Sequence, residues 1–379
     1  MNRTRFSPWP AVLLLAALAA YLSPQWGGPT VFPPQAASPH RTVPGLSLPG
    51  GLGGTAAGEP SVPVPSALTP QSRQLFEQVR PASVQIEQLG ADGSGGLGSG
   101  FFISGSGLLL TAYHVVDGAR VIRVRTVSDQ VFNARVVGFD NAADVALLQI
   151  QTRGTVPFLP LAASSPRVGE NVLAVGNSRG DFLQPRRGKL LALNAAAGNS
   201  TFPQDTLEMS APLAPGDSGG PIINTAGQAV GVVSYVRVGG QGETLSSYAV
   251  PVTSNEMLIS DLKAGVKRDV PAIGLYFDNV HDGATAPPGG VIGSVVNGSP
   301  AQKAGLMGLI RDDNDNVKGF GDIIVGVDGV RTRSADDAIF EIRRRQIGDT
   351  VTLSVDRNGA RREVQLPLVA KGSLSFSQP

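Results

Sequence analysis

The sequence predicts a mainly β protein. Between Ser83 and about Leu262, short runs rich in Val, Ile and Leu alternate with turn signals such as Gly, Asn-Ala and Asp-Gln. The chain has 379 residues, 41% of them hydrophobic, which suits two or three domains with their own cores. Its 48 glycines and 29 prolines fit a chain with many turns. The spacing alone indicates an all-β region and does not specify which one.

Residues 1–22 are predicted to be an export segment. Arg3 and Arg5 precede an apolar run from Trp9 to Leu22, which is shorter than the roughly 20 residues of a comfortable membrane span. This favours a cleaved signal peptide, and a membrane anchor stays open as the alternative because the small-residue pattern at Ala17–Ala19 lies inside the run. Residues 23–67 are predicted to be a flexible linker because Pro, Gly, Ala and Ser dominate them.

The first folded domain is predicted to span residues 68–265. It opens with a short helix ending at Val79, for which Thr69 is the expected N-cap and Pro70 the first helical residue. A second helix is expected at residues 255–262, followed by a linker at residues 263–269.

Residues 216–221, Gly-Asp-Ser-Gly-Gly-Pro, carry the strongest chemical signal. A serine in a glycine-rich turn can act as a nucleophile, and the backbone N–H groups of Gly216, Asp217 and Ser218 can face a developing oxyanion. Serine needs a base to take its proton and a third group to orient that base. A histidine and a carboxylate elsewhere in the chain would supply these two roles.

His114 and Asp144 are the predicted partners of Ser218. His114 ends an apolar run typical of a buried strand, and Asp144 opens another such run. Taken singly, a Gly-rich turn, a histidine near an apolar strand and an Asp before a strand each have ordinary structural roles. Their joint occurrence in the order His, Asp, Ser is the order of chymotrypsin-type proteases.

Gly216–Gly220 also matches the nucleophile elbow of α/β-hydrolases. An α/β-hydrolase fold is therefore the competing interpretation. That fold needs a helix directly after the serine and the order Ser, Asp, His. Residues 221–233 instead form two short β-branched runs around a turn, which predicts a hairpin. His281 could complete the other order formally, but it lies in a loop-like stretch of a different domain.

The chain resembles the HtrA/Deg family of exported serine proteases over about residues 68–368. The motifs are Gly98–Ile103, Val168–Asn177, Ser247–Pro251, Gly298–Leu306 and Gly321–Gly329. This resemblance implies a chymotrypsin-like double β-barrel, with His114 and Asp144 on the first barrel, Ser218 on the second and a crossover near residues 152–161. It also implies a homotrimer, and the short stretch at residues 89–98 favours a simple trimer over a large cage.

Two single positions and one three-residue run depart from the family pattern. The family usually has Asn where this chain has Tyr113 and Asp217, and residues 212–214 replace its usual run before the nucleophile. The stretch at residues 210–215 contains no carboxylate that could hold a cationic side chain. We therefore expect cleavage after small or medium aliphatic residues and not after Lys or Arg.

The resemblance implies that residues 270–370 form a PDZ domain, a β-sandwich with helices. Ile273, Gly274 and Leu275 correspond to the loop that binds a peptide C-terminus, and the peptide would add a strand beside residues 275–277. An amphipathic helix is expected at residues 334–345. The alternative is a PDZ fold that serves only as a spacer or an oligomer contact.

Composition argues against several function classes. The chain has no cysteine, which excludes a thiol nucleophile, and its net charge of +1 predicts no nucleic-acid partner. The three histidines are far apart, so neither a metal nor another cofactor is expected. The acidic run Asp312–Asn316 invites a calcium interpretation, but it lacks the glycine and the distal Glu of an EF-hand, which favours a solvated loop.

These observations predict an exported serine endopeptidase that degrades unfolded or damaged polypeptides and whose PDZ domain binds peptide C-termini. The expected location is a periplasm, another envelope space or the medium, with a membrane tether if residues 1–22 are retained. The alternative is an exported chaperone or peptide sensor with a latent protease domain, because a sequence does not show whether active-site loops rest in a competent state.

Overall fold

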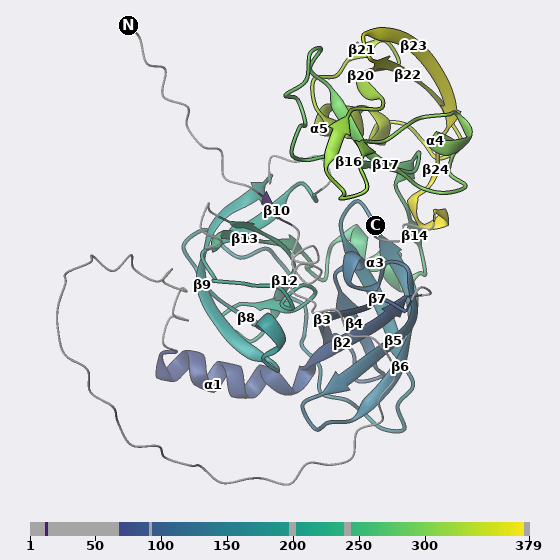
Figure 1. The fold of residues 1–379 in the computed structure, drawn as a ribbon. Helices are drawn as coiled ribbons and strands as arrows, with labels where there is room; N and C mark the ends of the chain where they lie inside the picture. The colour runs from purple at the N-terminus through teal and green to yellow at the C-terminus, as the bar shows by residue number, and fades with distance from the viewer. Residues whose placement is uncertain (1–11, 14–67, 91–92, 197–201, 239–243, 375–379) are drawn as a thin grey trace, which may run out of the picture.

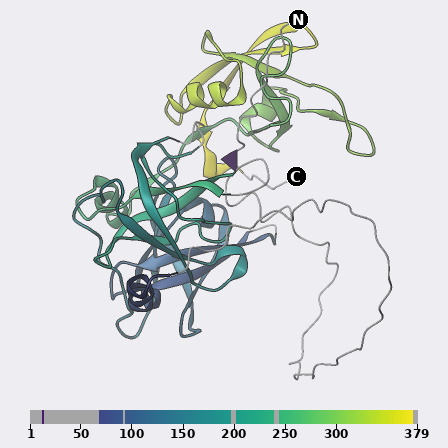
Figure 2. The same cartoon turned by 90° about the vertical axis from the view of Figure 1, so that its left-hand side faces the viewer.

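The computed structural model describes residues 12–13, 68–90, 93–196, 202–238 and 244–374. Two β-barrels lie side by side, and a smaller domain sits above them (Figure 1). A view turned by 90° shows the same separation between the barrels and the smaller domain (Figure 2). Apart from the two-residue strand β1 (Val12–Leu13), which pairs with β12, the predicted export segment and linker lie outside the described residues.

The first barrel closes because its end strands, β6 and β7, pair with each other. Its strands run in the spatial order β6, β5, β2, β3, β4, β7. Their bounds are β2 (Ser83–Gly90), β3 (Gly95–Phe102), β4 (Leu108–Thr111), β5 (Ala119–Thr126), β6 (Val131–Asp140) and β7 (Val145–Ile150). A short helix, α2 (Tyr113–Val116), follows β4 directly.

The second barrel closes in the same way, through pairing of β12 with β13. The strands follow the order β12, β11, β8, β9, β10, β13. They are β8 (Asn171–Gly176), β9 (Gln184–Ala195), β10 (Thr206–Met209), β11 (Pro221–Ile223), β12 (Ala229–Val238) and β13 (Thr244–Pro251). The hairpin predicted after the nucleophile is β11–β12, so the helix that a hydrolase elbow requires is not there. The predicted double β-barrel is confirmed.

Helices flank the barrels close to where the sequence predicts them. The first, α1 (Pro70–Val79), is capped by the Thr69 hydroxyl, which accepts the Ser72 N–H at 3.2 Å, and it leads into the 3₁₀ turn η1 (Arg80–Ala82). It contacts β8 of the second barrel, and its Val79 is buried in a core cluster that includes Phe101 and Leu147 of the first barrel and Ile223 of the second. The helix α3 (Met257–Lys263) closes the domain. No helix of the described residues is long and apolar enough to cross a membrane.

The stretch predicted as a simple linker belongs to the first barrel's sheet. Strand β14 (Lys267–Arg268) pairs in parallel with the end of β6, and the Arg268 guanidinium lies 2.6 Å from the Asp261 carboxylate on α3. The segment that connects the protease domain to the smaller domain is therefore hydrogen-bonded to the first barrel.

The smaller domain has the predicted PDZ fold. Its main sheet runs in the order β16 (Leu275–Phe277), β17 (Gly290–Val295), β20 (Ile323–Val327), β22 (Thr350–Arg357) and β23 (Ala360–Pro367), with β21 (Val330–Arg331) paired to β20. The helices are α4 (Pro300–Lys303) and α5 (Ala335–Arg343), the latter capped by Ser334. Strand β15 (Pro271–Ala272) pairs with β24 (Val369–Ala370), and the 3₁₀ turn η3 (Lys371–Ser373) follows.

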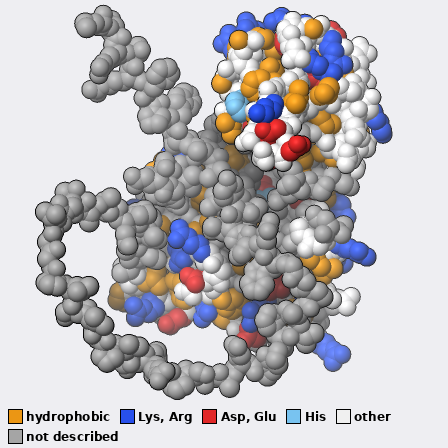
Figure 3. All heavy atoms as spheres, viewed as in Figure 1, with side chains coloured by type: hydrophobic (Ala, Val, Ile, Leu, Met, Phe, Trp, Pro, Cys, Tyr) orange, Lys and Arg blue, Asp and Glu red, His pale blue; other side chains and the backbone are white. Residues whose placement is uncertain are grey.

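The acidic run at residues 312–316 is the tip of a hairpin between β18 (Ile310–Arg311) and β19 (Val317–Gly319). The Asp312 carboxylate accepts the N–H groups of Asn314 and Asn316 and lies 3.3 Å from the Lys318 ammonium, so this charge is paired within the loop. No cluster of potential metal ligands occurs among the described residues. On the PDZ face shown in Figure 3, acidic and basic side chains are interspersed with hydrophobic ones.

Candidate active site

The predicted base and its orienting carboxylate lie together on the first barrel. His114 belongs to α2, and Asp144 sits at the turn that enters β7. The His114 Nδ1 atom lies 2.8 Å from Asp144 Oδ2, while Asp144 Oδ1 accepts the His114 backbone N–H at 2.9 Å. One carboxylate therefore fixes both the ring and the backbone of His114. Asp144 reaches this position with a φ of 56°, which is unusual for a residue other than glycine.

Ser234 is a further residue of this site, and sequence reasoning missed it. Its hydroxyl donates to Asp144 Oδ2 at 2.5 Å from strand β12 of the second barrel. It lies in an apolar run with no motif around it, so only the approach of the two barrels reveals its role. Asp144, only 7% exposed, thus accepts hydrogen bonds from both barrels.

Ser218 lies against the segment that carries His114. Its carbonyl oxygen accepts the Ser99 N–H at 2.8 Å, and a Cβ built on the next residue, Gly219, would stand 2.9 Å from the Ala112 nitrogen. The same Cβ would be 2.2 Å from the Ser99 carbonyl oxygen, so only glycine fits at 219, where φ is +85°.

Two buried polar atoms at this junction have no hydrogen-bond partner among the described residues: Ser218 Oγ and His114 Nε2. Buried polar groups without partners are rare in folded proteins and require an explanation. Catalytic hydrogen bonds are often long or poorly aligned until substrate binds. Both atoms belong to residues that the sequence predicts to be the nucleophile and the base.

The turn before Ser218 differs from its expected arrangement in one respect. The Asp217 N–H donates to the Ala214 carbonyl at 3.1 Å, so it is not available to an oxyanion. The reason is the tight turn at residues 214–217, which Gly216 closes with a φ of +98°. Within the described part of the chain, the N–H groups of Gly216 and Ser218 make no hydrogen bond.

Ser99 and Asn177 hold this turn from the other side. The Ser99 hydroxyl donates to the Gly216 carbonyl at 2.6 Å and accepts the Asn177 backbone N–H at 3.0 Å. Both side chains are fully buried. With the Gly216 carbonyl tied to Ser99, the peptide that follows it is fixed in orientation. Both residues occur in the family motifs, but the motifs did not indicate this contact.

The Asp217 side chain is buried beneath the turn. Its Oδ2 atom accepts the Ala214 N–H at 3.0 Å and the hydroxyl of Ser178, while Oδ1 has no partner within the described residues. Burial raises the pKa of Asp217 to about 6, although the hydrogen bonds from Ser178 and Ala214 and the charge of Arg186 act to lower it.

Asp217→Asn is expected to stabilise the protein at pH 8 and to have little effect at pH 4. Because the folded-state pKa is above that of the unfolded chain, stability falls as pH rises from about 4 to 6, and the ionised carboxylate costs up to about 3 kcal/mol above that window. Thermal unfolding at both pH values measures this. The matched control is Asp181→Asn, which removes an exposed carboxylate nearby. Equal shifts for both variants at pH 8 would contradict the expectation.

The residues predicted to bind a peptide C-terminus form the loop between β15 and β16. Gly274 has a φ of +85°, and a Cβ there would stand 2.2 Å from Ser299 Cβ. The Ile273 and Gly274 carbonyls accept the N–H groups of Ala301 and Val296, whereas the N–H groups of Ile273 and Gly274 make no hydrogen bond within the described residues. Leu275 begins β16, an edge strand of the PDZ sheet. His281 belongs to this domain, 2.5 Å from the Asp278 carboxylate, and is not part of the catalytic site.

Double β-barrels whose junction brings together His, Asp and Ser define the class of trypsin-like serine peptidases. Family models agree: a trypsin-like peptidase domain matches residues 98–232, and a PDZ domain matches residues 271–368. The chain belongs to the HtrA/Deg family of trypsin-like serine proteases with a C-terminal PDZ domain.

Two named relatives support this assignment. A serine protease named HhoA from Synechocystis is 30% identical over 280 residues, which cover 69% of this chain and 67% of that protein. A DegP-like periplasmic serine endoprotease from Pseudomonas fluorescens is 28% identical over 310 residues, which cover 80% of this chain and 62% of that protein. The chain thus spans less than two thirds of the length of the latter. A serine endoprotease structure from Yersinia pestis is 24% identical, with a TM-score of 0.46, and the match covers 80% of this chain and 99% of that one.

Proposed function

We propose that this protein is a serine endopeptidase that cleaves unfolded or damaged exported polypeptides through an acyl-enzyme on Ser218. The observation that carries the proposal is the junction of the barrels. There, the His114–Asp144 pair is joined at 2.8 Å, and the segment before His114 packs against the turn that carries Ser218, whose buried hydroxyl has no hydrogen-bond partner among the described residues. The family of the chain and the names of its relatives point the same way.

In the proposed mechanism, Ser218 Oγ attacks the scissile carbonyl carbon while His114 Nε2 takes its proton. Asp144 keeps the other ring nitrogen protonated and stabilises the imidazolium that forms. The N–H groups of Gly216 and Ser218 bind the oxyanion of the tetrahedral intermediate. His114 then donates its proton to the leaving amine, and water releases the acyl group by the reverse sequence of proton transfers.

A fluorophosphonate probe tests the nucleophile directly. Such probes phosphonylate an activated serine with loss of fluoride, and intact-mass spectrometry reports the adduct. We expect one adduct per chain, located on the peptide that contains Ser218, and none in Ser218→Ala. An adduct elsewhere, or no adduct on folded protein that digests casein, would contradict the proposal.

Cleavage is expected after small or medium aliphatic residues. Ala211 and Leu213, which precede the nucleophile turn, are buried, and their carbonyls are held by the hydroxyls of Ser247 and Thr244. Glu208, the carboxylate on the preceding strand, already accepts from Tyr248 and lies 3.5 Å from the Arg237 guanidinium. A cationic side chain would therefore lose its hydration without a free counter-charge. Cut sites mapped by mass spectrometry in digested casein decide this, and a majority after Lys or Arg would refute it.

The PDZ domain is proposed to bind peptide C-termini at the loop of Ile273, Gly274 and Leu275. Free N–H groups on a loop beside an edge strand suit β-augmentation by an added peptide. A Cβ at Gly274 would stand 2.2 Å from Ser299 Cβ, so Gly274→Glu should displace this loop and abolish binding of aliphatic-ended peptides in fluorescence titration. Lys318→Met, on the hairpin at residues 310–319, should bind as wild type. Unchanged binding in Gly274→Glu would show that peptides bind elsewhere, and no binding by the wild type would favour the spacer role.

The setting is proposed to be the periplasm or another space outside the cytoplasm, because the predicted export segment agrees with the relatives named periplasmic. A homotrimer completes the proposal, together with a membrane tether if residues 1–22 are retained.

A further inference from the structure

A segment that follows the PDZ sheet returns to the protease domain. We call residues 369–374 the C-terminal strap. It starts in β24, where Ala370 pairs with Pro271, and passes through η3 (Lys371–Ser373) toward the first barrel beside β14 (Figure 1). The Lys371 N–H donates to the Val270 carbonyl at 3.0 Å, which fixes the strap against the interdomain linker.

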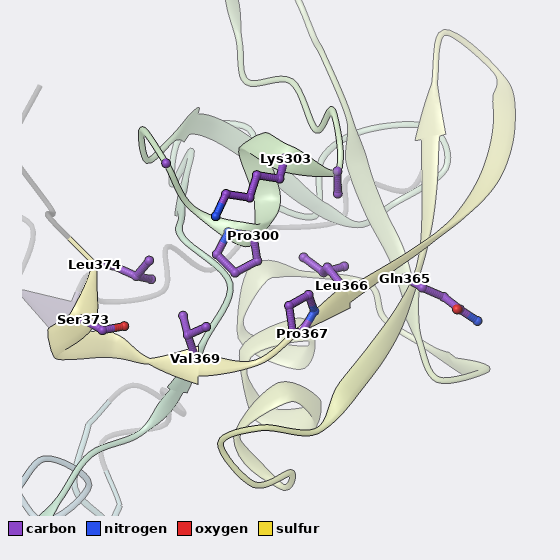
Figure 4. Close-up of a pocket in the computed structure, with 10 residues that line it drawn as sticks. Pro300, Lys303, Gln365, Leu366, Pro367, Val369, Ser373 and Leu374 are labelled. Atoms are coloured by element: carbon purple, nitrogen blue, oxygen red, sulfur yellow. The ribbon is translucent and has the colours of Figure 1, made fainter.

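The strap is part of the PDZ domain as well. Figure 4 shows Val369, Ser373 and Leu374 on one side of a cavity of about 390 Å³ and Pro300 and Lys303 of α4 on the other. Ala301, which follows Pro300 in α4, donates its N–H to the Ile273 carbonyl of the predicted peptide-binding loop at 2.9 Å. The position of the strap therefore depends on the position of the PDZ domain relative to the protease domain.

The strap contacts the segment that carries His114. The Lys371 ammonium lies 2.9 Å from Asp117 Oδ2, and Asp117 is the C-cap of α2. The other oxygen of Asp117 accepts the Tyr113 hydroxyl at 3.1 Å. Burial, together with the charges of Asp117 and Asp269, raises the pKa of Tyr113, so its hydroxyl remains a donor. Lys371 is thus linked through Asp117 to the residue just before His114.

The strap also contacts the segment that carries Asp144. The Gly372 N–H donates to Asp269 Oδ2 at 2.8 Å, and Asp269 Oδ1 accepts the Asn141 side-chain amide at 2.6 Å. Asn141 lies in the turn between β6 and β7, and its carbonyl accepts the Asp144 N–H at 3.3 Å. Asp144 is therefore three hydrogen bonds away from the strap, and Tyr113, the neighbour of His114, is two contacts away.

Tyr113 joins these two paths. Its ring stacks on Phe139 of β6 with centroids 4.5 Å apart, and its N–H donates to the Asp144 carbonyl at 3.1 Å. The side chain is buried, so a shift of Asp117 would move packed atoms on both sides of the catalytic pair.

We propose that Lys371 is a positioning residue, through which the PDZ domain holds the His114 and Asp144 segments in their catalytic arrangement. The proposal rests on the proteolytic triad proposed above. Lys371 touches neither substrate nor the reacting atoms, so its effect should appear in kcat and not in KM. An ion pair of this partly exposed kind contributes up to about 1 kcal/mol, which corresponds to about fivefold in rate.

The test compares Lys371→Met, Asp117→Asn and the double variant in the full-length protein, with kcat and KM measured on a fluorogenic peptide. We expect kcat to fall about fivefold in each single variant with KM unchanged, and the double variant to be no worse than either single one, because both remove the same contact. Lys371→Arg should restore kcat to within about twofold, since it keeps the charge. Lys318→Met, which breaks a Lys–Asp pair at the remote hairpin, should match wild type.

Wild-type kcat in both single variants, additive losses, or a loss confined to KM would overturn the positioning role. If these results accompany an inactive Ser218→Ala control, the strap inference fails and the proposed function stands; an active Ser218→Ala overturns both. Asp117→Asn keeps the side-chain volume and the acceptor for Tyr113, so it carries the test by itself should Lys371→Met fail to fold.

Discussion

Ser218→Ala is expected to remove nearly all peptidase activity, a loss of about five to six powers of ten in kcat by analogy with other triad knockouts. The hydroxyl supplies the attacking oxygen, and the Ala side chain offers His114 no proton. Loss of one buried hydroxyl that has no hydrogen-bond partner within the described ranges should leave stability close to that of wild type. Digestion of unfolded casein measures the activity, and thermal unfolding measures the stability.

The matched control is Ser106→Ala, which removes an exposed hydroxyl in the turn between β3 and β4. It should digest casein at the wild-type rate. Equal digestion by wild type and Ser218→Ala would exclude Ser218 as the nucleophile and favour a protease activity from a contaminant or another site.

Asp144→Asn is expected to lower kcat about ten-thousand-fold. Asp144 accepts three hydrogen bonds: from the His114 ring, from the His114 backbone N–H and from the Ser234 hydroxyl. An amide has only one oxygen, so its NH₂ must face at least one of these donors. If it faces Nδ1, that nitrogen becomes the acceptor and the proton moves to Nε2, which then cannot take the proton of Ser218.

The measurement is kcat and kcat/KM on a fluorogenic peptide. Asp129→Asn is the control because that carboxylate is exposed and remote. A kcat/KM for Asp144→Asn within tenfold of wild type would show that the carboxylate does not set the His114 tautomer. Circular dichroism of both variants should superimpose on wild type.

Much of the fold follows from local features of the chain. Thr69 and Pro70 specify the start of α1, and Ser334 specifies that of α5, because their side chains or dihedrals satisfy the orphan N–H groups of a first turn. The turn residues at 224–228 and the β-branched runs on either side specify the β11–β12 hairpin. The double barrel required the family resemblance, because alternation along a strand does not say which strand closes on which.

Part of the site could also be predicted. The glycines around Ser218 are needed where positive φ and close backbone approach leave no room for a Cβ, so the motif itself indicates a special turn. The roles of Ser234 and Ser99 could not be predicted, since each acts on a residue 90 or more positions away, across the two barrels. The expected contribution of the Asp217 amide to the oxyanion site was not reproduced, because only the folded turn shows that its N–H is already bonded to Ala214.

The sequence by itself determined the class of fold, the family and the residues of the proposed chemistry: His114, Asp144 and Ser218. These are local properties, set by side-chain chemistry, chain order and backbone preference. Only the tertiary structure decided which donors remain free at the nucleophile turn, that Asp217 is buried deeply enough to raise its pKa, and that Lys371 reaches Asp117 from 254 residues away. Desolvation and contacts between distant segments depend on packing, which no local pattern encodes.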